Sequence, residues 1–181
     1  INYNKNKRGS MTIIVVDVES DGPIPFDYSM ISFGAIVLDD KLDKTFYAEL
    51  SPISEKWIPE ALAVSGFSRE RTKTFLDPKT AMLQFDNWLS SVSNGKLMFY
   101  SDNNGYDWQF INWYFHHFLG KNPFGHSSTN INSLYKGMEK SMFVNCKHLR
   151  KTKHTHHPVD DAKGNAEALQ AMVRMGLRLG K

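Results

Sequence analysis

An apolar run that ends in two acids constrains this chain more than any other segment. Residues 13–16 are Ile-Ile-Val-Val, and Asp17 and Glu19 follow with one residue between them. In a strand, residues two apart point to the same face, so both carboxylates would lie together. Carboxylates this close repel one another and resist full ionisation unless a cation neutralises them. The segment therefore predicts a buried strand over 11–18 that ends at a cation site.

Two further segments carry acids where a strand is expected to end or a helix to begin. Asp107 lies in SDNNGYDWQF, and His156 and Asp161 lie in HHPVDDA. If one fold gathers them, their oxygen ligands suit Mg²⁺ or Mn²⁺. Two such ions about 3.5–4 Å apart can clamp the attacking and leaving oxygens of phosphodiester hydrolysis. Histidine, with an unperturbed pKa of about 6.5, is then suited to accept the proton of the attacking water.

The order of these motifs resembles the DEDDh branch of the DnaQ-like 3′→5′ exonucleases (the group that includes RNase T, oligoribonuclease and proofreading enzymes). The stretch 58–68 is also similar to a segment that this family often carries between its first and second motifs. Two positions depart from the family pattern, because Ser65 and Asp102 stand where many members have histidine. The three motifs are D-x-E, N-x-x-x-D and H-x-x-x-x-D, matched here by Asp17 to Glu19, Asn103 to Asp107, and His156 to Asp161.

The resemblance implies a metal-dependent exonuclease that hydrolyses single-stranded RNA or DNA from a free 3′ end to 5′-monophosphates. His156 would deprotonate the attacking water, and two Mg²⁺ or Mn²⁺ ions would be coordinated by Asp17, Glu19, Asp107 and Asp161. Family members often pair, so a homodimer is compatible with the resemblance. The alternatives are an inactive nucleic-acid-binding module of the same fold and a DNA proofreading exonuclease that acts with a polymerase.

Candidate substrate contacts lie beside the first two motifs. The backbone from Val18 to Ser20 and the side chain of Asn103 would hold the 3′-terminal nucleotide. The rings of Phe26 and Tyr106 are candidates to stack on its base. Asp107 could also serve only as the N-cap of the helix that follows it.

A basic stretch precedes the third motif. No acidic residue occurs between Lys140 and Val159, and the lysines there include Lys151 and Lys153. Such a run is often a solvated loop. Its place just before His156 instead favours a role in holding the backbone phosphates of an incoming strand.

The same stretch permits a zinc hypothesis, since it contains several histidines and the single cysteine: Cys146, His148, His154, His156 and His157. Structural zinc sites usually have two separated ligand pairs, so this is the less favoured interpretation. The adjacent His156 and His157 should point in different directions, and at most one is expected to face the metals. The resemblance implies four residues between the histidine and the final aspartate, which selects His156, because His157 would pair at that spacing with Ala162.

Length and composition favour one folded domain over residues 11–181. The chain has 181 residues, of which 41% are hydrophobic, enough for one buried core. Residues 1–10 resemble a cloning remnant, and without their three basic residues the formal charge of +3 falls to zero. No apolar run approaches the roughly 20 residues of a membrane-spanning helix, so we expect a soluble, cytoplasmic protein with no membrane partner.

The pattern of apolar and turn residues predicts an α/β domain, and the resemblance implies the ribonuclease-H-like form of it. We expect a mixed sheet of about five strands flanked by helices, with its first three strands largely antiparallel. The last third shows no clear pattern until residue 159. Strands are expected over 11–18, 30–38, 44–50 and 97–100, and helices over 58–64, 78–91, about 107–118 and 160–177.

Overall fold

Five strands form one mixed sheet in the order β3-β2-β1-β4-β5. The first three strands pair antiparallel, whereas β4 and β5 run parallel to β1. The computed structural model describes residues 10–180, so most of the suspected cloning remnant lies outside the described residues. The predicted five-stranded mixed sheet is confirmed. Its strands are β1 (Met11–Ser20), β2 (Met30–Val37), β3 (Thr45–Glu49), β4 (Lys96–Ser101) and β5 (Ser128–Asn130).

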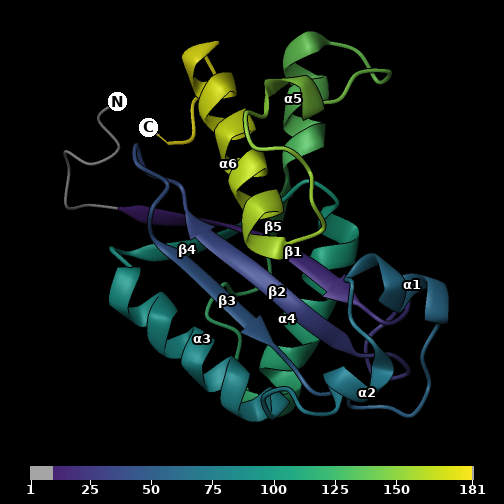
Figure 1. Cartoon of the computed structure of the whole chain (residues 1–181). Coiled ribbons are helices and arrows are strands. Elements are labelled where there is room, and N and C mark those ends of the chain that lie inside the picture. Colours follow the sequence, from purple (N-terminus) through teal and green to yellow (C-terminus); the bar gives the residue numbers. More distant parts are fainter. Residues whose placement is uncertain (1–9, 181) are drawn as a thin grey trace.

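Helices cover both faces of the sheet. Figure 1 shows α3 (Pro78–Val92) and α4 (Asn104–Leu119) on one side, and α5 (Ile131–Glu139) and α6 (Pro158–Arg174) on the other. Two short helices, α1 (Pro59–Val64) and α2 (Arg69–Thr72), follow β3, and the 3-10 helix η1 (Lys147–Leu149) precedes α6. None of the helices within residues 10–180 has the length and apolar character needed to cross a bilayer.

Strand β1 contributes to the core on both faces. Ile14 and Val16 pack in the cluster that includes α3 and α4, whereas Ile13 and Val15 pack in the cluster under α6. Because strand side chains alternate, Asp17 and Glu19 continue the face of Ile13 and Val15. This face of β1 therefore changes from apolar to acidic near the first turn of α6.

The first turn of α6 packs closely against β2 at Gly34. Gly34 is the ladder partner of Asp17. A Cβ at this position would lie 2.4 Å from the Val159 nitrogen and 2.5 Å from the Pro158 carbonyl carbon, closer than real Cβ atoms approach. Glycine here therefore allows α6 to bring its first-turn residue Asp161 beside Asp17.

The structure differs from the expected elements mainly in the last third of the chain. β5, α5 and η1 were not foreseen, because β5 consists of three polar residues and gives no alternating apolar pattern. Helix α4 begins at Asn104, with Asn103 as its N-cap, so the N-cap alternative for Asp107 is wrong. Asp107 instead lies in the first turn of α4.

Candidate active site

Three carboxylates from two elements converge at the end of β1. Asp17 and Glu19 come from this strand and Asp161 from the first turn of α6. Oxygen atoms of these three residues lie within 4.8 Å of one another. Asp161 is 1% exposed, so one of the three acids is almost fully removed from water.

Asp107 lies beside this group and is itself buried. Its Oδ1 accepts a hydrogen bond from the Val18 amide at 3.1 Å. Its Oδ2 is buried without a hydrogen-bond partner among the described residues. A buried carboxylate oxygen that lacks a donor is costly, and a bound cation would remove that cost. The same hydrogen bond occupies the Val18 amide, which the sequence analysis had proposed as a contact to the 3′-terminal nucleotide.

The acids raise one another's pKa values. Burial, followed by the charges of Asp107, Glu19 and Asp161, raises the pKa of Asp17 well above its ordinary value. Burial, and then the charge of Asp161, raises the pKa of Glu19 to about 7. Burial and the charge of Asp102 also raise the pKa of Asp107. The group therefore resists full ionisation, as expected of carboxylates placed to hold a cation.

The loop before α6 is held in place by acids of that helix. Asp161 accepts hydrogen bonds from the amides of Thr155 and His156 at 3.2 and 2.9 Å. Glu167, which lies further along the same helix, accepts hydrogen bonds from the amides of Lys151 and Thr152 at 2.8 and 2.7 Å. These bonds fix the backbone that carries the histidines.

The histidines of this loop take different directions. His156 Nδ1 lies 3.6 Å from Glu19 Oε1, and the side chain is 48% exposed. His156 has a φ of 59°, which non-glycine residues rarely adopt. His157 turns away and stacks on Tyr47, with 4.8 Å between the ring centroids. His154 Nδ1 lies 2.7 Å from Asp161 Oδ1, a contact that sequence reasoning missed.

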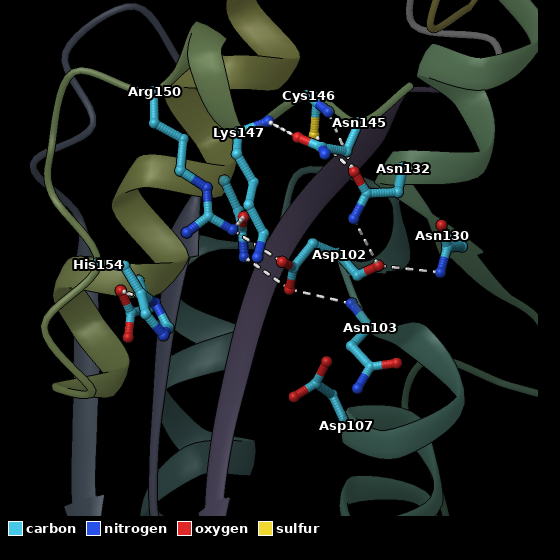
Figure 2. Close-up of polar contacts among 12 residues, drawn as sticks. Asp102, Asn103, Asp107, Asn130, Asn132, Asn145, Cys146, Lys147, Arg150 and His154 are labelled. Carbon is cyan, nitrogen blue, oxygen red and sulfur yellow. Dashed lines mark hydrogen bonds and ion pairs between the residues drawn. The ribbon is translucent and has the colours of Figure 1, made fainter. Parts of the chain in front are cut away.

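A buried polar network joins the second motif to the third (Figure 2). Arg150 Nη2 lies 2.7 Å from Asp102 Oδ2 and also donates to Asn165 of α6. The amide of Asn165 donates to Asp102 Oδ1 at 3.1 Å. Asp102, one of the departures from the family pattern, therefore ties the start of α4 to the loop and to α6.

The other candidate substrate contacts differ in how far they are exposed to solvent. Ser20 is buried, and its Oγ donates to the Gly22 carbonyl at 2.5 Å and also contacts the Tyr106 hydroxyl. Phe26 is 70% exposed. The Asn103 side chain is exposed, makes no capping bond and is drawn beside Asp107 in Figure 2. Phe26 and Asn103 thus have surface available for a ligand.

A basic cavity of about 290 Å³ lies next to the loop. Lys151 and Lys153, proposed from the sequence as phosphate contacts, both line it and are exposed. The cavity offers cationic side chains next to His154, which itself contacts Asp161. Its other lining residues are Asp102, Lys147, Arg150, Thr152 and His154.

The zinc hypothesis that involved Cys146 is not supported, because Cys146 bonds Asn132 and His148 contacts Tyr135.

Comparison with known sequences gives one informative relative. No family model matches the chain. The chain is 46% identical over 128 residues to a protein of Escherichia coli named 3′-5′ DNA exonuclease Cap18. The match covers 69% of this chain and 68% of that protein.

Several solved structures that match this fold are nucleases. The nuclease domain of 3′hExo, a DEDDh family member bound to rAMP, matches with a TM-score of 0.73 and 17% identity, over 94% of this chain and 96% of that one. Exonuclease I of E. coli in complex with a dT13 oligonucleotide matches with a TM-score of 0.70 and 14% identity. That match includes 92% of this chain but only 41% of Exonuclease I. These low identities establish the fold alone, which is the ribonuclease-H-like fold expected from the sequence.

Proposed function

Because the chain belongs to the DEDDh family of 3′→5′ exonucleases, we propose that it removes nucleotides one at a time from the 3′ end of single-stranded DNA. The observation that carries the proposal is the convergence of Asp17, Glu19 and Asp161 within 4.8 Å, with buried Asp107 beside them. Nothing in a purely structural role explains four acids gathered where burial opposes their ionisation.

The donor set fits hard divalent cations. Enzymes of this family generally use divalent metal ions, and the oxygen-only set of Asp17, Glu19, Asp107 and Asp161 suits Mg²⁺ or Mn²⁺. Two bound ions would neutralise the charge that develops on the attacking and leaving oxygens. The unpartnered Oδ2 of Asp107 supports the fit, since coordination would satisfy it.

His156 is the proposed base for the attacking water. Its ring is half exposed, which leaves it room to turn toward a water beside the scissile phosphate. The ring already lies beside the carboxylates, since its Nδ1 is 3.6 Å from Glu19 Oε1. The backbone bond from His156 to Asp161 holds the base next to the acids throughout.

The choice of DNA rests on the relative of 46% identity, whose name specifies DNA. The choice of a single strand rests on the sequence, because residues 11–181 carry no net formal charge and so offer little electrostatic energy for opening a duplex. Lys151 and Lys153 would hold the phosphates of the upstream nucleotides, and Phe26 and Tyr106 would contact the terminal base. A homodimer and a cytoplasmic location stay predictions.

The test compares 5′-end-labelled single-stranded DNA and RNA of one sequence, with Mg²⁺ or Mn²⁺ and with a chelator. We expect a ladder of single-nucleotide steps, faster on DNA, and no cleavage after chelation. Asp17→Ala should abolish cleavage, whereas Asp160→Ala, which changes a neighbouring acid of α6 outside the carboxylate group, should retain it. Full activity of Asp17→Ala would refute the assignment, and faster cleavage of RNA would refute the choice of substrate.

A further inference from the structure

His154, His156 and Asp161 form a second set of ligand atoms, and the proposed exonuclease chemistry does not use the first of them, His154. One ligand atom from each residue lies within 4.8 Å of the others. His154 Nδ1 lies 2.7 Å from Asp161 Oδ1, and the two imidazole centroids are 4.2 Å apart. Figure 2 shows His154 on the loop beside the start of α6. We propose that this triad binds one Zn²⁺ ion.

The chemistry of the set differs from that of the four carboxylates. Two imidazole nitrogens and one carboxylate oxygen match the ligands of Zn²⁺, with the fourth tetrahedral position open to water. Mg²⁺ prefers oxygen ligands and octahedral geometry, so it competes poorly for two nitrogens. Affinity for such a site also rises toward the end of the first transition series, which favours Zn²⁺ over Mn²⁺.

The triad combines one fixed ligand with two that can adjust. Asp161 is 1% exposed and is oriented by two loop amides. The side chains of His154 and His156 are 52% and 48% exposed, so their rings can rotate. Ligand atoms around tetrahedral Zn²⁺ lie about 3.3 Å apart, given bonds of about 2.0 Å. Small ring rotations about the fixed carboxylate would bring both nitrogens to that spacing.

Zinc at this triad would inhibit the enzyme, and this part of the inference rests on the proposed function. The ion would occupy His156, the proposed base, and would share Asp161 with the proposed Mg²⁺ or Mn²⁺ site. Both roles would be lost together while His154 supplies the additional ligand. Micromolar Zn²⁺ is therefore expected to stop cleavage even in millimolar Mg²⁺.

The decisive experiment measures Zn²⁺ binding directly, without nucleic acid. Metal-free protein in millimolar Mg²⁺ competes with a chromophoric zinc indicator near neutral pH. We expect one Zn²⁺ per chain, and His154→Ala should weaken binding at least about 10-fold, since loss of even an outer-shell partner costs about 10–100-fold. His157→Ala, the matched control, should bind like the wild type because its ring lies against Tyr47.

Two results would overturn the site: zinc affinity that survives His154→Ala, or an equal loss in His157→Ala. Cleavage assays then separate the two claims. Inhibition by Zn²⁺ that His154→Ala relieves supports the regulatory role, and inhibition that is equal in both proteins contradicts it. A wild-type protein that binds Zn²⁺ but does not cleave DNA in Mg²⁺ would refute the proposed function and leave the zinc site standing.

Discussion

Replacing Glu19 by glutamine should stabilise the metal-free protein while removing its activity. The Glu19 side chain is 12% exposed, and burial together with Asp161 raises its pKa from 4.5 to about 7. Glutamine keeps the size of the side chain and carries no charge to desolvate. The folded state of the variant therefore avoids an unfavourable ionisation.

The magnitude follows from linkage. Below about pH 4.5 Glu19 is protonated in both the folded and the unfolded chain, and the group has no effect. As the pH rises from 4.5 to about 7, the unfolded chain releases a proton that the folded chain keeps, so the free energy of unfolding falls. Above pH 7 the decrease in the free energy of unfolding is complete. It amounts to roughly 3 kcal/mol, because each unit of pKa difference corresponds to about 1.4 kcal/mol. This is an upper limit for what Glu19→Gln recovers.

Urea unfolding in the presence of a chelator measures the effect. At about pH 8 we expect Glu19→Gln to be more stable by about 1–3 kcal/mol, or by about 3–10 °C in Tm, and near pH 4.5 to match the wild type. Exposed Glu55→Gln serves as the control and should change stability by less than about 0.5 kcal/mol. A gain of equal size at both pH values, or none at pH 8, would refute the electrostatic reasoning.

Three further predictions use independent measurements. His156→Ala should lower the single-turnover cleavage rate by about 10²–10⁴-fold and His157→Ala far less; the reverse order would mean that the third motif is read one residue out of register. Gly34→Ala should cost about 1–3 kcal/mol in urea unfolding because the new Cβ meets α6, whereas Gly105→Ala has no atom within 4 Å of its Cβ; equal stability of both variants contradicts the packing argument. Circular single-stranded DNA should survive an incubation that degrades the linear form, and nicked circles on a gel would rule out an exonuclease.

Local spacing was enough to predict those parts of the site that depend on one element. The alternation of side chains along a strand places Asp17 and Glu19 on one face whatever packs above them. The run from His156 to Asp161 crosses the start of one helix, so its register also follows from the sequence. The mixed sheet is predictable for the same reason, because four of its five strands carry an apolar pattern.

Features that depend on contacts between distant elements were not predictable. The approach of Asp161 to Asp17 requires that residue 34 be a glycine without a side chain, and Gly34 lies in none of the three motifs. The contact between His154 and Asp161 depends on a loop whose backbone is held by Glu167 and includes a positive φ at His156. β5 escaped notice because pairing with β4, and not its own polar residues, makes it a strand.

The network around Asp102 has a consequence for how related sequences can diverge. The Arg150 side chain is 8% exposed, and Asp102 is its only acidic partner among the described residues. Removing Asp102 would leave a buried cation without a counter-charge, which would lower the free energy of unfolding by about 3–5 kcal/mol. Changing Asp102 to the histidine that many family members carry would therefore be tolerated only with a compensating change at position 150. We expect positions 102 and 150 to covary among relatives. An acid at position 102 should occur with arginine at position 150, and a histidine at position 102 should occur with an uncharged residue at position 150.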